Sequence, residues 1–108
     1  MFVYDITEFF PKSELYGSTN QLRRAAVSVM LNNVEGFARR KPKVQLNFYE
    51  IAYGSIKETK YLIFLAYQRK WIVPERYDYG FQLAEEICRM LWSTIEGLEK
   101  HIENGGDQ

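Results

Sequence analysis

The side chains best suited to chemistry in this sequence are basic, and they gather at two places in its first half. One pair is Arg23 and Arg24, and the second group is Arg39, Arg40, Lys41 and Lys43. Residues 20–43 hold these six basic side chains against one carboxylate, Glu35, which is a net charge of +5. Basic side chains that neutralise phosphates release counterions, which gives nucleic-acid affinity without base reading. The pattern predicts phosphate binding at both places; for Arg23 and Arg24 the alternative is pairing with carboxylates at a helix or subunit contact.

The spacing of these two basic groups places them at different ends of one helix. At 1.5 Å per residue, Arg39 would lie about 24 Å along the axis from Arg23. A monomer would therefore have two basic ends and no single basic patch. In a ring of identical copies each end would repeat, so that several phosphates could be contacted together.

A smaller polar group follows the spacing of one helix face. Asn32, Glu35 and Arg39 stand at i, i+3 and i+7, and Glu58 from a facing helix could join them. Two carboxylates and a guanidinium could support acid–base or metal chemistry. Helix-borne di-metal centres need Glu-x-x-His pairs, however, and the sequence contains none. We therefore interpret the four residues as a buried, hydrogen-bonded cluster that fixes the helix register.

The chain lacks the residues that most enzymes and structural metal sites require. Its one Cys and one His cannot form an intramolecular disulfide or a Cys/His zinc site. Cys88 occupies an apolar heptad position, so we expect it to be a small buried hydrophobic residue. His101 lies near the end of the chain, so we expect it to be solvated. The sequence has no Gly-rich phosphate loop and no nucleophile motif. We expect a protein that is not an enzyme, with no catalytic residue, metal or cofactor.

Two further patterns concern membrane insertion and secretion. The longest apolar run, residues 61–67, is too short to cross a bilayer. The first residues have neither the basic region nor the apolar stretch of a signal peptide. We expect a cytoplasmic protein with no membrane partner.

Hydrophobic periodicity predicts an all-α protein. The clearest helix starts at Pro74, a residue suited to the first helical turn, and carries an apolar heptad stripe. The stripe consists of Tyr77, Phe81, Ala84, Cys88, Leu91, Ile95, Leu98 and Ile102. A second helix is expected over 43–68, a third from an N-cap at Ser18 or Thr19, and a short one within 2–10 that Pro11 ends. The prediction is an antiparallel up-down four-helix bundle with a shortened first helix, one domain over 1–103 and a flexible tail over 104–108.

The expected helix over 43–68 has two apolar stripes side by side. One contains Phe48, Ala52, Ser55, Thr59, Leu62 and Ala66. The other contains Tyr49, Ile56, Ile63 and Tyr67. Two stripes indicate two contacts, one with the bundle core and one with another subunit.

Two motifs in the sequence resemble those of a known bacterial family. The first consists of Phe10-Pro11-Lys12, the run from Gln21 to Val29, Asn32, Glu35-Gly36 and Arg39. The second consists of Phe48-Tyr49, Ile51-Ala52, Gly54-Ser55 and Glu58. Together they resemble the four-helix-bundle family named for 23S ribosomal RNA intervening sequences, and more distantly the RNA-binding accessory bundles of retroelements. The resemblance implies a homo-oligomeric ring, most often a pentamer, with no catalytic activity.

The sequence departs from this family at its beginning. Only ten residues precede Pro11, whereas family members have a first helix about twice as long. Either the natural chain continues ahead of Met1, or one corner of the core is thin and partly exposed.

Charge leaves two functions open. Residues 74–108 carry three basic and eight acidic groups, a net charge of −5, and the whole chain is neutral with 14 of each sign. The basic helix ends favour a non-enzymatic oligomeric bundle that binds RNA or other nucleic acid. The neutral total and the acidic last helix favour the alternative, a protein–protein adaptor or scaffold ring with no nucleic-acid role.

Overall fold

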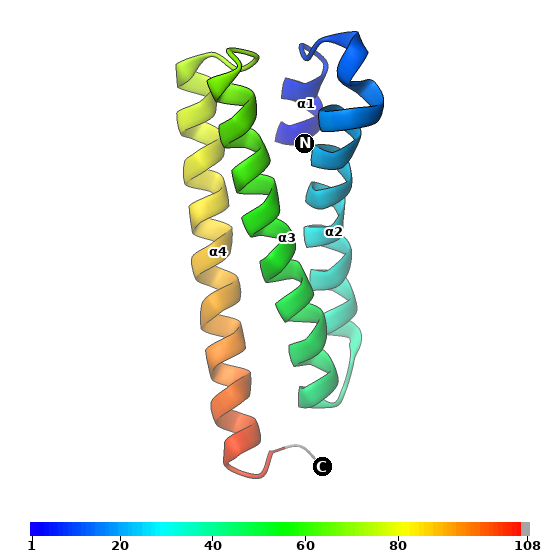
Figure 1. Cartoon of the computed structure of the whole chain (residues 1–108). Helices are drawn as coiled ribbons and strands as arrows, with labels where there is room; N and C mark the ends of the chain where they lie inside the picture. Colours follow the sequence, from blue (N-terminus) through cyan, green and yellow to red (C-terminus); the bar gives the residue numbers. More distant parts are fainter. Residues whose placement is uncertain (107–108) are drawn as a thin grey trace.

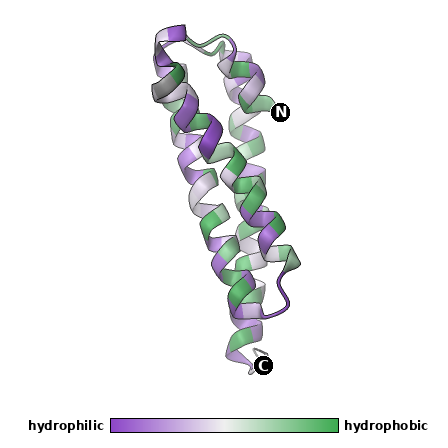
Figure 2. Ribbon diagram, turned by 90° about the vertical axis from the view of Figure 1, so that its right-hand side faces the viewer, coloured by the Kyte–Doolittle hydropathy of each residue, from purple (hydrophilic) through white to green (hydrophobic). Residues whose placement is uncertain are grey.

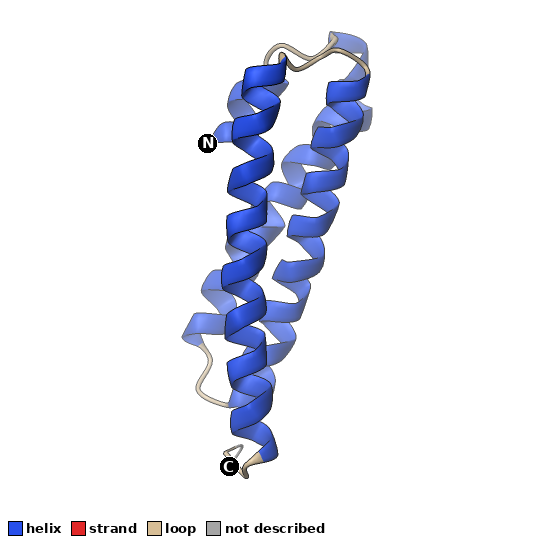
Figure 3. Cartoon of the chain, turned by 90° about the vertical axis from the view of Figure 1, so that its left-hand side faces the viewer, coloured by secondary structure: helices blue, strands red, loops and turns tan. Residues whose placement is uncertain are grey.

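The computed structural model describes residues 1–106, apart from the side chain of Tyr16, and this part of the chain is helical without strands. Its α-helices are α1 (Phe2–Thr7), α2 (Asn20–Ala38), α3 (Pro42–Gln68) and α4 (Pro74–Glu103). In Figure 1 the three long helices lie side by side in alternating directions, with α1 beside the upper part of α2. Figure 3 shows that short loops make the connections at both ends. The predicted all-α up-down bundle with a shortened first helix is confirmed.

The entry into α2 differs from the prediction. A 3₁₀ turn, Lys12–Glu14, and a π-helical stretch, Leu15–Thr19, lead directly into the helix. Thr19 is buried and already has helical backbone angles, φ −62° and ψ −51°, and its side chain makes no capping hydrogen bond. The carboxylate of Glu14 instead accepts a hydrogen bond from the backbone N–H of Ser18 at 3.5 Å. Helix α2 therefore begins where the sequence predicts, at Asn20 with Thr19 in the N-cap position, but the expected side-chain cap is not formed. Upstream, Gly17 interrupts the helical backbone with φ −105° and ψ −110°.

The core divides into an upper and a lower cluster. The upper cluster includes α1 and consists of Val3, Ile6, Phe10, Leu22, Ala26, Ile63, Ala66 and Ile72. The lower cluster is built by the three long helices alone and consists of Val29, Tyr49, Ala52, Ile56, Ala84, Cys88, Leu91 and Ile95. The heptad stripe of α4 and the burial of Cys88 are therefore confirmed.

Helix α3 is the central element, because α2 and α4 both pack along it. Members of both of its apolar stripes are buried in the core, among them Ala52 and Thr59 of one stripe and Ile56 and Ile63 of the other. Both stripes therefore contribute to the core, because α3 has a long neighbour on each of two sides. The expected contact of one stripe with another subunit stays a prediction.

The ends of α3 and α4 have the same hydrogen-bond pattern, but the residue with a positive φ is Lys70 after α3 and Gly105 after α4. In α4, Gly106 N–H donates to His101 C=O and Gly105, at φ 81°, donates to Ile102 C=O. In α3, the N–H of Trp71 donates to the carbonyl of Ala66. The N–H of Lys70, whose φ is 65°, donates to the carbonyl of Tyr67. Both are Schellman ends, which favour glycine at the positive-φ residue. Helix α4 ends at Glu103, at the predicted boundary between the domain and the tail 104–108; residues 107 and 108 lie outside the described part.

Candidate nucleic-acid interface

The connection between α2 and α3 places the predicted basic residues at one end of the molecule. Helix α2 ends at Ala38, and Arg39, Arg40 and Lys41 follow in extended or bent backbone, while Lys43 lies in the first turn of α3. All four side chains are exposed. The connection has the hydrophilic colour in Figure 2. We call Arg39, Arg40, Lys41 and Lys43 the basic end.

Backbone hydrogen bonds hold this connection in place. Arg39 N–H donates to Gly36 C=O at 3.3 Å, which closes the last turn of α2. The carbonyl of Lys41, the N-cap residue of α3, accepts from the N–H groups of Val44 and Gln45 at 3.0 Å. A positioned loop loses less conformational entropy on binding a ligand than a floppy one.

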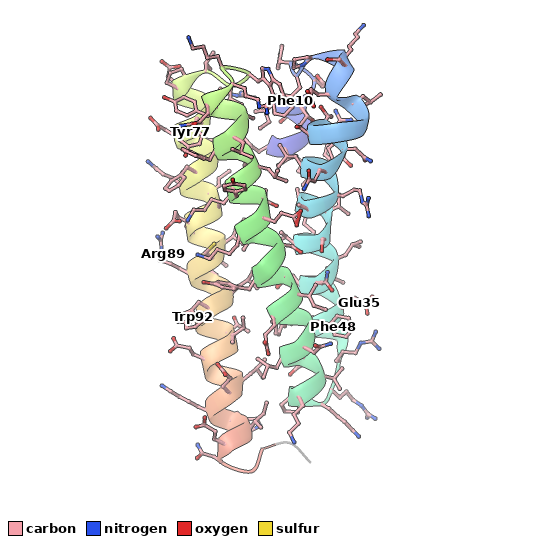
Figure 4. The ribbon with its side chains drawn as sticks, in the orientation of Figure 1. Phe10, Glu35, Phe48, Tyr77, Arg89 and Trp92 are labelled. Atoms are coloured by element: carbon pink, nitrogen blue, oxygen red, sulfur yellow. The ribbon has the colours of Figure 1, made fainter. Side chains whose placement is uncertain are left out.

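Arg39 is already engaged within the chain. Its Nη2 lies 2.5 Å from Glu35 Oε2, one turn earlier on α2, and its guanidinium lies 5.1 Å from the ring centroid of Phe48 on α3. Figure 4 shows Glu35 and Phe48 close together on the lower parts of the two helices. Glu35 therefore offsets part of the positive charge of the basic end.

The start of α3 adds to this positive charge. Pro42 is the first helical residue, and the helix that follows is 27 residues long. Aligned peptide dipoles give a helix N-terminus a partial positive charge of about half an elementary unit. The basic side chains and the helix end therefore favour an anion in the same region.

Arg23 has a structural role at the other end of α2. Its Nε donates to Thr7 Oγ1 at 2.8 Å, and its guanidinium lies 4.8 Å from the ring centroid of Tyr4. Thr7 is buried, and its hydroxyl also donates to Val3 C=O at 2.8 Å. Arg23 therefore fastens α1 to α2 through a hydroxyl and an aromatic ring, and not through the pairing with a carboxylate that was the alternative to phosphate binding.

Arg24 lies beside a shallow polar hollow of about 470 Å³ between α2 and α3. The exposed carboxylate of Glu58 lines the same hollow, together with Ser28 and Ser55. Arg24 and Glu58, which carry opposite charges, therefore border the same hollow. The two predicted basic places lie at opposite ends of α2, as the helix geometry required.

The four residues of the predicted polar cluster do not form one buried group. Asn32 donates to the backbone carbonyl of Ser28 at 2.9 Å, while Glu35 and Arg39 pair with each other with side chains 48% exposed. Glu58 lies with Arg24. The prediction of a buried cluster is wrong, because Glu35 and Arg39 lie on the solvent side of the helix although they share its spacing with Asn32.

Two polar contacts between helices were missed by sequence reasoning. The hydroxyls of Ser28 on α2 and Ser55 on α3 lie 2.7 Å apart. Lys60 on α3 forms an ion pair with Glu85 on α4. The hydrogen bond between them lowers the pKa of Glu85 and raises the pKa of Lys60. The small Ser55 in an apolar stripe was the available signal for the first contact; the second joins residues 25 positions apart and has no local signal.

No three His, Cys, Asp or Glu side chains among residues 1–106 gather so that they could hold a metal ion. Burial raises the pKa of Tyr77, which stacks on Tyr67 with ring centroids 4.2 Å apart, but this pair belongs to helix packing. Within the same residues, no helix is long and apolar enough to cross a membrane.

Comparison with known proteins gives a family and a structural relative. The model of the 23S rRNA-intervening sequence protein family matches residues 1–93. No curated protein matches the chain. A solved structure from Bacteroides thetaiotaomicron, a protein of unknown function from the S23 ribosomal protein family, is similar with a TM-score of 0.79 and 22% identity. The similarity covers 86% of this chain and 87% of that one, and at this identity it supports the fold alone.

The family match spans most of the chain, including the basic end and the helices that position it. The chain belongs to the 23S rRNA-intervening sequence protein family.

Proposed function

We propose that this protein is a non-enzymatic, homo-oligomeric bundle that binds RNA through its basic end, in the cytoplasm. The observation that carries the proposal is the exposure of Arg40, Lys41 and Lys43 at the positive start of α3. Such a surface contacts phosphates and not base edges, so the binding should depend strongly on salt and weakly on sequence. The family name, which refers to 23S rRNA, makes RNA the first nucleic acid to test.

Oligomerisation strengthens this proposal, because a neutral monomer with a few exposed basic side chains binds a polyanion weakly. Repeating the basic end in each copy would raise the effective concentration of the remaining sites once one is engaged. The pentameric ring implied by the family resemblance stays a prediction.

The proposal is tested by removing the basic end and comparing affinities. The triple variant Arg40→Ala/Lys41→Ala/Lys43→Ala should bind a fluorescent ribosomal RNA fragment roughly 10–100-fold more weakly, since each exposed ionic contact contributes about 0.5–1 kcal/mol. The matched control is Lys12→Ala/Arg89→Ala/Lys100→Ala, which removes the same charge from exposed positions scattered over the molecule. Equal loss in both variants would mean that the basic end has no special role.

The protein–protein adaptor remains the competing function, and the exposed hydrophobic side chains of α2 favour it. It predicts that the wild-type protein shows no measurable RNA affinity at low salt while remaining folded and assembled.

A further inference from the structure

The polar hollow of about 470 Å³ between α2 and α3 is separate from the basic end, because Arg24 lies about 22 Å along α2 from Arg39. Its volume is within the roughly 300–1,000 Å³ of small-ligand sites. Such sites are mostly apolar, whereas polar side chains line this one. They are Asn20, Gln21, Arg24 and Ser28 from α2, and Ser55 and Glu58 from α3. A ligand of this hollow must therefore bring hydrogen-bonding groups that match them.

Hydrogen bonds already hold one edge of this hollow in place. The hydroxyls of Ser28 and Ser55 lie 2.7 Å apart and join the two helices. The side-chain amide of Asn32 donates to the hydroxyl of Ser28 at 3.1 Å and to its carbonyl at 2.9 Å. Because this edge is ordered before a ligand arrives, binding there costs less conformational entropy.

The serine contact places Arg24 and Glu58 at the same level of the hollow. Helices α2 and α3 run in opposite directions, as Figure 1 shows. Arg24 is one turn before Ser28 on α2 and Glu58 is one turn after Ser55 on α3, so both lie on the same side of the serine contact. Both side chains are exposed, and neither has a hydrogen-bond or ion-pair partner among residues 1–106. A guanidinium from one helix and a carboxylate from the other are therefore available to a ligand.

Guanine is the nucleobase whose hydrogen-bonding groups match this pair. Its N1–H and its amino group point the same way, and a carboxylate can accept both bonds. On another edge its O6 and N7 both accept, which is the pattern that an arginine recognises with two parallel bonds. Adenine and cytosine place an acceptor beside their amino group, and uracil has one N–H between two carbonyls, so each would set a lone pair against the carboxylate.

We propose that the hollow between α2 and α3 binds a guanine base, with Glu58 accepting from N1–H and the amino group and Arg24 donating to O6 and N7. The exposed amides of Asn20 and Gln21 remain for the attached ribose. The inference rests on the proposed RNA binding, to which it adds a preference for guanine at one unpaired position. A free guanine nucleotide carries the same base, so the experiments below separate the two sources.

Titration with mononucleotides, followed by the backbone amide signals in NMR, tests the site without RNA. Guanosine monophosphate should shift the signals of Gly17, Ser28 and Ser55 with a dissociation constant of about 0.1–10 mM. Inosine monophosphate, which lacks only the amino group, should bind about fivefold more weakly, and adenosine monophosphate should leave these signals in place. If guanosine monophosphate does not shift them, or adenosine monophosphate shifts them equally, the proposal is overturned.

Two matched glutamate substitutions on α3 test the role of the carboxylate. Glu58→Gln replaces one acceptor oxygen with an amino group and should weaken the binding of guanosine monophosphate at least fivefold. Glu50→Gln makes the same change at an exposed position of α3 that does not line the hollow, and it should leave the binding unchanged. Circular dichroism confirms that both variants are folded. Equal affinities of the two variants would contradict recognition by Glu58.

Short single-stranded RNAs decide the source of the base. By fluorescence anisotropy, an oligouridine with one central guanosine should bind about fivefold more tightly than the same strand with a central adenosine. Arg40→Ala/Lys41→Ala/Lys43→Ala should weaken the binding of both strands and preserve their ratio. A ratio near one, with guanosine monophosphate still bound in the hollow, supports the guanine site and assigns it to free nucleotides. The mononucleotide titrations contain no RNA, so their failure is distinguishable from failure of RNA binding at the basic end.

Discussion

The ring of Phe2 lies so close to the backbone of Gly80 that a Cβ at residue 80 would come within 2.4 Å of it. This contact joins α1 to α4, while Arg23 joins α1 to α2 through Thr7. A six-residue helix is marginal by itself. These two contacts, together with its buried side chains, hold it between its long neighbours.

Gly80→Ala should therefore destabilise the protein, because the added methyl group displaces the Phe2 ring and loosens α1. Overpacking of this kind costs about 1–3 kcal/mol, of which the helix preference of alanine offsets about 0.5–1 kcal/mol. Gly97→Ala is the matched control on the same helix, since no other atom lies within 4 Å of a Cβ there. It should stabilise the helix by about 0.5–1 kcal/mol. Urea denaturation measures both, and equal effects of the two substitutions would contradict this view of α1.

Arg23→Ala should cost about 1–2 kcal/mol of unfolding free energy, because it leaves the buried Thr7 hydroxyl without its donor and removes the contact with Tyr4. Arg24 is the next residue and its side chain is exposed, so Arg24→Ala should change the free energy of unfolding by less than about 0.5 kcal/mol. The comparison separates a structural arginine from a surface arginine in one adjacent pair. A stable Arg23→Ala protein with weakened RNA binding would instead return Arg23 to the phosphate-binding group.

Much of the fold follows from the sequence, and the reasons are local. The heptad stripe of α4 and the prolines at Pro42 and Pro74 act within one helix, so periodicity and backbone preference predict them. The start of α2 was predicted at the right place, but Thr19 is buried with helical backbone angles and makes no capping hydrogen bond.

The candidate site was harder to predict, because it depends on which side of a helix faces a neighbour. Spacing correctly placed Asn32, Glu35 and Arg39 on adjacent positions, but could not show that the ion pair points to solvent. Contacts such as Ser28 with Ser55 require the register of α2 against α3, which exists only after the core has packed. The basic end was predictable because its residues are consecutive and lie at a turn.

Lys70→Gly should stabilise the protein. Lys70 has a positive φ of 65° at the end of α3, whereas Gly105 occupies the equivalent position after α4. Removing the Cβ relieves a conformational cost of about 1 kcal/mol, less the entropy that glycine adds to the unfolded chain. Thermal denaturation should show a higher melting temperature. Lys12→Gly, at a position without positive φ, serves as the control and should lower it.

The Lys60–Glu85 pair should make stability depend on pH in two windows. The pKa of Glu85 lies below its usual 4.5, so its contribution is complete above about pH 4.5 and is lost as pH falls through the lower folded value. The pKa of Lys60 lies above its usual 10.5, so its contribution is complete below that pH and is lost as pH rises through the higher folded value. The difference in urea midpoint between wild type and Glu85→Gln should be largest near neutral pH and shrink below pH 4.5. A difference that stays constant down to pH 3 would contradict the pairing.

The measurement that tests the central claim most directly is the affinity of the wild-type protein for a structured ribosomal RNA fragment at two salt concentrations. If the basic end binds phosphates, fluorescence anisotropy should show binding at about 50 mM salt and a loss of at least tenfold at about 200 mM, because counterion release makes the affinity fall steeply with salt. Binding that does not change with salt, or no binding at about 50 mM by folded protein, would contradict RNA recognition through the basic end.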